Sequence, residues 1–216
     1  MKTLYGVYGS SGFGREVMPL VAQQFGGDPG KELVFIDDAP GAAALNGRPV
    51  LSFDQFLAAG ADRKQVCLAI ANSAIRQRLA DKCESAGVGF MDVRAANLVC
   101  MDAVSVGEGA ILSPFVTLTS NVRIGRHFHA NLYSYVAHDC VIGDFVTFAP
   151  AVKCNGNIVI EDHAYIGTGA ILRQGTPGKP LVIGRGAVVG MGAVVTRDVA
   201  PGTTVVGNPA KPLIKV

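Results

Sequence analysis

The sequence predicts two domains of different fold class, an α/β domain over residues 1–95 and a parallel β-helix over residues 96–216. In the first ninety residues, strand-like and helix-like segments alternate, which indicates a parallel sheet with crossover helices. From about residue 100 onward, an aliphatic or small apolar residue recurs at every sixth position. Neither a helix period nor a strand period produces this register. Six-residue repeats are typical of parallel β-helices.

Three apolar strands are expected in the first domain, at residues 4–8, 33–36 and 66–70. In a parallel sheet the carboxyl ends of the strands meet at one edge, and ligands bind beyond that edge. The residues that follow the three strands are a glycine-rich turn at 9–14, Asp37 with Asp38, and Ala71 with Asn72. Such a turn lets the backbone approach a phosphate, and a carboxylate suits a ribose hydroxyl or a base edge. We therefore expect a nucleotide-bearing ligand here. The Gly-x-x-Gly-x-Gly spacing differs from that of dinucleotide sites, so NAD is not expected.

Two helix starts in this domain carry capping signals. Ser52 and Gln55 match a capping box that opens a short helix. Asn72 or Ser73 is expected to cap a further helix.

In the second domain, each hexapeptide is expected to supply one short strand and one corner, with three hexapeptides to a triangular coil. Glycine often follows the repeat position, where we expect it to tolerate corner backbone angles that other residues resist. The interval from Leu172 to Ile183 holds about five extra residues, which predicts a protruding loop at residues 173–180. The residues at the repeat position are Cys100, Val106, Leu112, Leu118, Ile124, Ala130, Val136, Ile142, Phe148, Cys154, Ile160, Ile166, Leu172, Ile183, Val189 and Val195.

Composition limits the class of partner. A net charge of +2 with 17% charged residues argues against nucleic acid as a partner. No apolar run reaches the length of about 18 residues that spans a bilayer, so membrane insertion is not expected. The N-terminus reads as a strand rather than a signal peptide. Cys100, Cys140 and Cys154 fall on inward positions of the repeat, as expected for reduced core residues of a cytoplasmic protein.

Together these residues resemble the bacterial nucleotide-sugar N-acetyltransferases. The motifs that carry the resemblance are Gly9-Ser10-Ser11-Gly12-Phe13-Gly14, Phe35-Ile36-Asp37-Asp38, Ala69-Ile70-Ala71-Asn72, Asn131-Leu132-Tyr133-Ser134-Tyr135-Val136-Ala137-His138-Asp139, Gly156-Asn157, and Val206-Gly207-Asn208-Pro209-Ala210-Lys211. The resemblance covers essentially the whole chain. It implies a Rossmann-like domain followed by a left-handed β-helix, a homotrimer, acetyl-CoA as co-substrate and no metal. The implied acceptor is the amine, at position 4, of a UDP- or dTDP-linked amino-deoxy sugar that serves surface glycan synthesis.

The resemblance also implies the catalytic residues. His138 would be the general base, because an imidazole accepts a proton near neutral pH, and Asp139 would orient the imidazole or raise its basicity. The backbone N–H of Gly156, one coil beyond His138, would stabilise the thioester oxygen in the transition state. Direct transfer to the bound amine is expected, with no acyl-enzyme.

Further contacts are implied by the same motifs. For the nucleotide sugar they are Ser11, Gly12, Phe13, Asp37, Asp38, Ala71, Asn72 and Asn131. For acetyl-CoA, in a groove between neighbouring β-helices, they are Thr147, Gly156, Thr168, Met191, Gly207, Asn208 and Pro209. The cations that could pair with CoA phosphates are Arg173, Lys179, Arg185 and Lys211. The chain departs from the family at Phe13, where His is frequent, at Ser11 and Ala71, where Gly is frequent, and at Thr147, where some members have a second His.

Other readings compete with this one. A sugar O-acetyltransferase of the sialic-acid type shares the two-domain plan and differs in the acceptor, a hydroxyl rather than an amine. A β-helical metal enzyme would need three converging histidines with a pair five apart, which this chain lacks. A non-catalytic scaffold would need neither His138 with Asp139 nor the first domain. His127, His129 and His163 are expected to be surface or subunit-interface residues.

Overall fold

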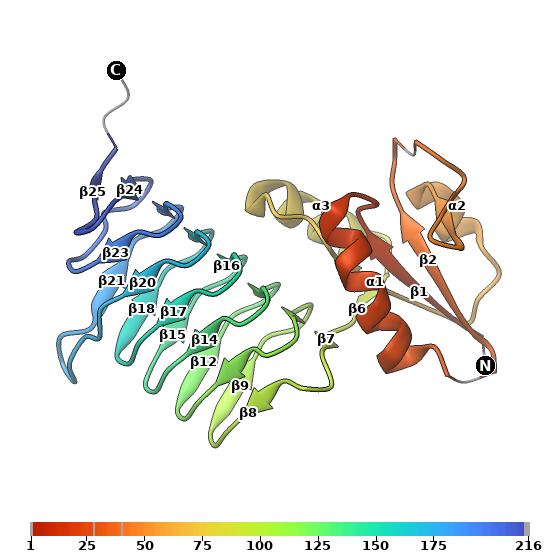
Figure 1. The fold of residues 1–216 in the computed structure, drawn as a ribbon. Coiled ribbons are helices and arrows are strands. Elements are labelled where there is room, and N and C mark those ends of the chain that lie inside the picture. Colours follow the sequence, from red (N-terminus) through yellow and green to blue (C-terminus); the bar gives the residue numbers. More distant parts are fainter. Residues whose placement is uncertain (1, 28, 40, 214–216) are drawn as a thin grey trace. The chain divides into compact units, whose positions relative to one another are not determined.

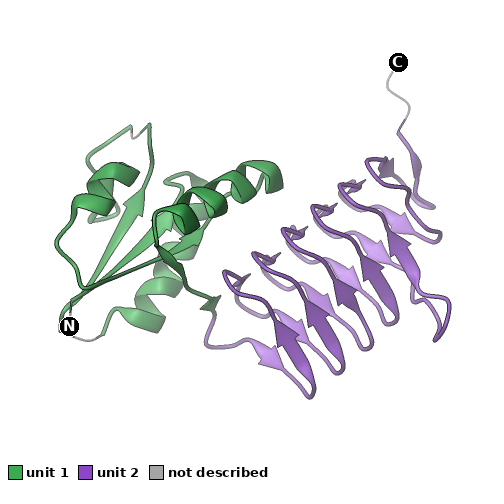
Figure 2. Cartoon of the chain, turned by 180° about the vertical axis from the view of Figure 1, so that it is seen from behind, with its two compact units in different colours: residues 1–94 green, residues 95–216 purple. Residues whose placement is uncertain are grey.

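Two units make up the chain, residues 1–94 and 95–216 (Figure 2). The computed structural model describes residues 2–27, 29–39 and 41–213. Residue 1 of the first predicted domain and residues 214–216 of the second lie outside the described residues. In the described chain, no helix is both long and apolar enough to cross a membrane.

The first unit is built around a sheet with the strand order β3-β4-β2-β1-β5-β6, shown in red to yellow in Figure 1. Strands β1, β2, β4, β5 and β6 run parallel, and β1 lies between β2 and β5. The bounds of its strands are β1 Thr3–Tyr8, β2 Lys31–Ile36, β3 Ala44–Leu45, β4 Arg48–Leu51, β5 Arg63–Leu68 and β6 Gly89–Phe90, and the short β7 Val93–Arg94 lies outside this sheet. All six residues of β1 are buried, as expected for a strand covered on both faces.

The helices of this unit are α1 Gly12–Phe25, α2 Phe53–Ala58 and α3 Ser73–Ser85. The predicted capping box is confirmed, because Ser52 and Gln55 exchange both of its hydrogen bonds. Asn72, rather than Ser73, caps α3. The sequence analysis missed the β3–β4 hairpin. Its turn at Asn46 and Gly47 has positive φ at both residues, which is the signal of a two-residue hairpin.

Short parallel strands stack on three faces in the second unit (Figure 1). Face 1 holds β8 Val99–Cys100, β11 Thr117–Leu118, β14 Tyr135–Val136, β17 Lys153–Cys154, β20 Ile171–Leu172 and β23 Val194–Val195. Face 2 holds β9 Val104–Val106, β12 Val122–Ile124, β15 Val141–Ile142, β18 Ile158–Ile160 and β21 Leu181–Ile183. Face 3 holds β10 Ile111–Leu112, β13 His129–Ala130, β16 Thr147–Phe148, β19 Tyr165–Ile166, β22 Val188–Val189, β24 Thr204–Val206 and the antiparallel β25 Lys211–Pro212.

The register gives the length of each coil. Ala130 pairs with Phe148, 18 residues on, and Val136 pairs with Cys154 at the same interval. Across the predicted loop, Ile160 pairs with Ile183, 23 residues on, so the five extra residues are confirmed. From Leu112 onward the repeat residues are buried in an apolar interior, as the ring of Phe148 illustrates with no exposed surface.

Two expectations about the repeat were wrong. Glycines directly after the repeat position do not adopt positive φ; a Cβ on Gly143 would lie 2.7 Å from the backbone nitrogen of Asp162 on the next coil. Close stacking of coils, rather than corner conformation, therefore explains these glycines. The left-handed residue is the third after the repeat position, for example Asp139 with φ 58°. Cys100 is exposed rather than buried, since it belongs to the first coil of the stack.

Candidate active site

At the carboxyl edge of the parallel sheet, the turn after β1 is tied to the end of β2. The Ser10 N–H donates to Asp37 Oδ2 at 3.2 Å, and the Ser10 hydroxyl donates to the same oxygen. Asp37 Oδ1 accepts from the Ala39 N–H at 3.1 Å. Burial opposes ionisation of Asp37, but these hydrogen bonds outweigh it and hold the pKa of this carboxyl below its usual value. A Cβ on Gly9 would lie 2.9 Å from Ala69 O, so the three strand ends meet.

Asp38, also predicted to contact substrate, is engaged within this unit. Its Oδ2 accepts from the Tyr8 hydroxyl at 2.7 Å and from Lys82 Nζ at 2.8 Å, and its Oδ1 accepts from the Phe53 N–H at 3.0 Å. The Lys82 ammonium also lies 4.4 Å from the centroid of the Phe53 ring. Burial opposes ionisation of Asp38, but the bonds from Lys82 and Tyr8 outweigh it and lower its pKa. Asp38 therefore holds β1, β2, α2 and α3 together.

The remaining residues predicted to contact the nucleotide sugar at this edge of the sheet differ in exposure and in whether their side chains are already hydrogen-bonded. Ser11 is the N-cap of α1 but makes no side-chain capping bond, and it is exposed beside Gly12. Phe13 is half-buried and Ala71 is exposed. The Asn72 side chain accepts the N–H of Ile75 at 3.0 Å and caps α3. The N-terminus of α1 is thus the more open part of the edge.

Each corner of the β-helix is named by one of its residues. The His138 corner joins face 1 to face 2, the His127 corner joins face 2 to face 3, and the Met191 corner joins face 3 to face 1.

At the His138 corner an imidazole and a carboxylate form a pair. His138 Nδ1 lies 2.7 Å from Asp139 Oδ2, and the two side chains are 48% and 47% exposed. The hydrogen bond with His138, followed by one from Asn121, lowers the pKa of the Asp139 carboxyl. Because an ionised carboxylate can only accept, Nδ1 is the donor in this bond, and in the neutral imidazole the lone pair is then on Nε2.

Gly156 lies under the ring of His138. A Cβ on Gly156 would come within 2.5 Å of His138 Cε1 and 2.6 Å of Nε2, so only glycine leaves the imidazole where it is. At the His127 corner, the corresponding N–H groups of Arg126 and Asp144 donate to the carboxylates of Asp144 and Asp162. Within the part of the chain that the structure describes, no such bond from the Gly156 N–H is found.

Most other predicted acetyl-CoA contacts lie at the Met191 corner. The Gly192 N–H donates to Thr168 O at 2.8 Å, and Val194 N–H donates to Gly207 O at 2.9 Å, which brings Thr168, Met191 and the 207–209 tail to one edge. Met191 is 82% exposed. Asn131 also lies at this corner, and its side-chain oxygen accepts the adjacent Leu132 N–H. Thr147 lies apart from both groups, buried on β16.

The other histidines were expected at the surface or at a subunit interface, and for two of them this was wrong. His127 is 0% exposed and His129 is 1% exposed within the single chain. The His127 ring stacks on Phe145 at 5.0 Å, and Phe145 stacks on His163 at 5.3 Å, one ring to each coil. His163 is half-buried.

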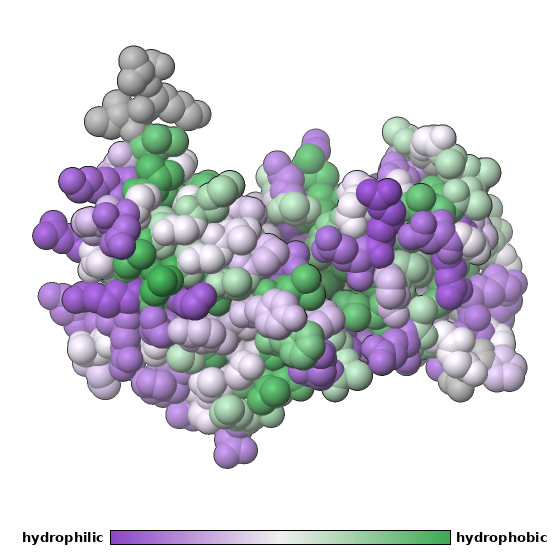
Figure 3. Space-filling model, viewed as in Figure 1, coloured by the Kyte–Doolittle hydropathy of each residue, from purple (hydrophilic) through white to green (hydrophobic). Residues whose placement is uncertain are grey.

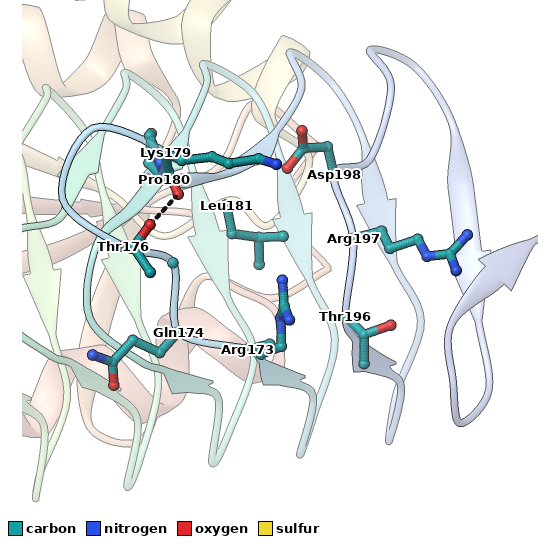
Figure 4. A pocket seen from close by; sticks show the side chains of 10 residues that line it. Arg173, Gln174, Thr176, Lys179, Pro180, Leu181, Thr196, Arg197 and Asp198 are labelled. Atoms are coloured by element: carbon teal, nitrogen blue, oxygen red, sulfur yellow. Dashed lines mark hydrogen bonds between the residues drawn. The ribbon is translucent and has the colours of Figure 1, made fainter.

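A polar pocket opens at the His138 corner on coils beyond Gly156. Figure 4 shows the side chains of Arg173 and Lys179 reaching into it from two sides, whereas Arg197 points away. Asp198 on its rim accepts the Val182 N–H at 3.0 Å. Hydrophilic residues line the outer edge of these C-terminal coils (Figure 3). The lining residues are Arg173, Gln174, Gly175, Thr176, Lys179, Pro180, Leu181, Thr196, Arg197 and Asp198.

Several residues of these sites were missed in the sequence. Lys82 gave no signal, because it sits in the last turn of a helix far along the chain from Asp38. Arg76 is fully buried and donates to Ile70 O at 2.6 Å; burial lowers the pKa of its guanidinium to about 9. Asn121 could have been found, since it precedes Asp139 by one 18-residue coil.

No group of three His, Cys, Asp or Glu side chains that could hold a metal ion occurs in the described residues.

The chain is similar to known proteins over nearly its whole length. Residues 6–83 match the PglD N-terminal domain family. The chain is 51% identical over 210 residues to the GDP-perosamine N-acetyltransferase of Escherichia coli O157:H7, covering 96% of this chain and 95% of that protein. WeeI from Acinetobacter baumannii AYE is 60% identical and superposes with a TM-score of 0.96, covering 98% of this chain and all of that one.

The acetyltransferase domain of PglB from Neisseria gonorrhoeae FA1090, solved with acetyl coenzyme A, is 27% identical and has a TM-score of 0.88 over 99% of this chain and 100% of that one. These relatives confirm the predicted fold class, an α/β domain followed by a left-handed β-helix. The chain therefore belongs to the bacterial nucleotide-sugar N-acetyltransferases, a family of acetyl-CoA-dependent acyltransferases.

Proposed function

We propose that the chain transfers the acetyl group of acetyl-CoA to the amine of a nucleotide-linked amino sugar, with His138 as the general base. The observation that carries this proposal is the pairing of His138 Nδ1 with Asp139 at 2.7 Å directly over Gly156. The imidazole side chain is 48% exposed and lies against the Gly156 backbone, which supports a role for the ring as base and for the Gly156 N–H as donor in acyl transfer.

In the proposed reaction, the amine nitrogen attacks the thioester carbonyl and a C–N bond forms. Nε2 of His138 takes one proton from that nitrogen, and the ionised Asp139 offsets the charge of the resulting imidazolium. The Gly156 N–H donates to the carbonyl oxygen as it becomes negative. When the C–S bond breaks, the imidazolium returns its proton to the CoA sulfur, so the enzyme ends unchanged and no acyl-enzyme forms.

The first acceptor to test is a GDP-linked amino sugar. The relative from Escherichia coli O157:H7, named for GDP-perosamine, is 51% identical over nearly the whole of both chains, which supports a GDP carrier over the UDP or dTDP carrier that the sequence motifs imply. The open N-terminus of α1 with exposed Ser11 and Gly12 supports binding of the diphosphate in the first unit. Position 4 for the amine stays a prediction, as does a cytoplasmic location in surface glycan synthesis.

A homotrimer is part of the proposal. The predicted acetyl-CoA contacts lie at two different corners of one β-helix, with Gly156 at one and Thr168, Met191 and residues 207–209 at the other. A neighbouring subunit that brought its Met191 corner to the His138 corner of the first would collect them around one cofactor. Sedimentation equilibrium should give three chains per particle; a monomer with full activity would contradict this arrangement.

The pocket of Arg173 and Lys179 is proposed to receive phosphates of acetyl-CoA. It lies at the same corner as His138 and two coils further on, roughly 10 Å along the axis at the usual strand spacing. We predict that Arg173→Ala with Lys179→Ala raises KM for acetyl-CoA about tenfold. The matched control is acetyl-pantetheine, which lacks phosphates, and its kinetics should not change. An equal loss with both donors would contradict the assignment.

The experiment that tests the function is CoA release from acetyl-CoA with GDP-, UDP- and dTDP-linked 3- and 4-amino sugars, with mass analysis of the sugar product. Turnover on a nucleotide-linked amine, with one acetyl group added, would support the proposal and identify the acceptor. Activity on a free hydroxyl acceptor alone, such as sialic acid, would overturn it in favour of O-acetylation.

A further inference from the structure

Asn121 reaches the catalytic pair from the preceding coil of the His138 corner. Its Nδ2 donates to Asp139 Oδ1 at 3.2 Å, while the other carboxylate oxygen, Oδ2, lies 2.7 Å from His138 Nδ1. Asn121, Asp139 and His138 therefore form a hydrogen-bonded chain that spans two coils and ends at the imidazole.

The second hydrogen bond matters because Asp139 lies at an exposed corner. Its side chain is 47% exposed, so water competes for both oxygens and a carboxylate with one partner can rotate. Bonds to two separate oxygens fix the plane of the carboxylate and so the direction in which Oδ2 faces the ring. Partners of this kind, one step removed from the reacting group, set the tautomer and orientation of histidines in other sites.

The backbone keeps Asn121 in place for this role. Asn121 and Asp139 both adopt left-handed conformations, with φ of 57° and 58°, and the Asp139 N–H donates to Ser120 O at 3.1 Å. Asn and Asp tolerate this conformation better than most residues. The backbone of this corner therefore places the side chains of Asn121 and Asp139 one above the other on successive coils.

The donor at this position is a neutral amide, which leaves the charge of Asp139 intact. A cation there would neutralise part of the charge that offsets the imidazolium. The charged side chain that shares the adjoining groove with Asn121 and Asp139 is Arg123, and among the hydrogen bonds of the described residues none joins it to Asp139.

We propose that Asn121 is a positioning residue for acetyl transfer, holding Asp139 so that His138 keeps its proton on Nδ1 and presents Nε2 to the amine. The inference rests on the proposed role of His138 as the base.

The kinetic test uses Asn121→Gly, which accepts the left-handed backbone and removes the amide. We expect kcat to fall about tenfold, with KM for both substrates within twofold, by analogy with other orienting partners. Asn46→Gly is the matched control, because Asn46 has a φ of 48° in the β3–β4 turn of the first unit; its kinetics should match the wild type. Unchanged kcat in Asn121→Gly, or a rise in KM for the nucleotide sugar alone, would overturn the proposal.

A double-mutant cycle asks whether Asn121 acts through Asp139. On an Asp139→Asn background, Asn121→Gly should cost less than a further twofold in kcat, since the carboxylate to be oriented is gone. A further tenfold loss would mean that Asn121 acts independently and would contradict the inference.

The nitrogen chemical shifts of the His138 ring test the same point without turnover. In the wild type the neutral imidazole should carry its proton on Nδ1, and in Asn121→Gly it should become a mixture of tautomers. If the wild type acetylates no nucleotide-linked amine, the proposed function fails while this readout still decides the role of Asn121. The same tautomer in both proteins would overturn that role.

Discussion

The His138 corner and the His127 corner of the same β-helix differ in how exposed they leave an imidazole to solvent. Both rings pack on a glycine: a Cβ would lie 2.5 Å from the His138 ring at Gly156 and 2.3 Å from the His127 ring at Gly109. His127 is covered on the next coil by the ring of Phe145 and is 0% exposed. The side chain of His138 is 48% exposed and pairs with a carboxylate.

The difference shows that residues on the neighbouring coils determine whether a corner histidine is buried or exposed. An aromatic ring stacked on the imidazole excludes water and turns the residue into part of a packed column. With a glycine on the next coil and a carboxylate beside the ring, the His138 side chain is 48% exposed, as its proposed role as a base requires. Residue type alone therefore does not separate a buried from an exposed histidine in this repeat.

The largest effect on the free energy of unfolding is expected from opening the packed column. Phe145→Ala should lower the free energy of unfolding by about 3 kcal/mol, because it removes a ring that is stacked between His127 and His163 and is 3% exposed. Urea unfolding measures the loss, and kcat per folded enzyme should stay near that of the wild type. If Phe145→Ala instead kept wild-type stability and lost kcat, the His127 corner would be coupled to the His138 corner rather than separate from it.

A smaller effect is expected from filling the space under His138. Gly156→Ala should lower kcat about thirtyfold, since the new Cβ displaces the imidazole and the amide beneath it. Steady-state kinetics with acetyl-CoA measures the loss. Gly60→Ala is the control, because nothing lies within 4 Å of a Cβ placed there. If Gly156→Ala kept wild-type kcat, catalysis would not depend on the present position of the His138 ring.

The smallest effect is expected from removing the charge of Asp38, the carboxylate at the sheet edge. The pKa of Asp38 is lowered in the folded chain, so its bonds stabilise the fold above the unfolded value of about 3.9 and lose that contribution as pH falls through the folded pKa. Asp38→Asn should destabilise at pH 6 by under about 1 kcal/mol, since the pair with Lys82 is half exposed. Urea unfolding at pH 6 and pH 3 should show the difference from wild type shrinking at the lower pH. A difference that grew at pH 3 would contradict the lowered pKa.

Much of the fold could be predicted because it repeats. The six-residue period identifies the axis residues and the five-residue insertion, and the alternation of strands and helices identifies the first unit. The 18-residue coil also places His138 in register with Gly156 and Asp139 in register with Asn121, although Asn121 was not singled out. The burial of His127 was not predicted from its own repeat position, although Phe145 follows it by the same 18-residue interval and could have indicated the stacked rings.

At the sheet edge, the order of strands predicted which residues meet but not which of them remain available. Asp37 and Asp38 are adjacent in sequence, yet Asp38 is bonded on both oxygens by three partners from β1, α2 and α3. Those partners lie up to 44 residues away along the chain, so no local pattern reports them. The capping of α3 by Asn72 was visible because it is local.

The most direct test compares His138→Ala with His127→Ala on the acceptor that the wild type acetylates, with kcat and thermal unfolding measured for both. Loss of the proposed base should lower kcat about a thousandfold and leave the unfolding temperature unchanged. His127→Ala should lower the unfolding temperature while the folded enzyme keeps kcat within about threefold, since its ring belongs to the packed column. Retention of a tenth or more of wild-type kcat by His138→Ala would contradict the assignment of His138 as the base.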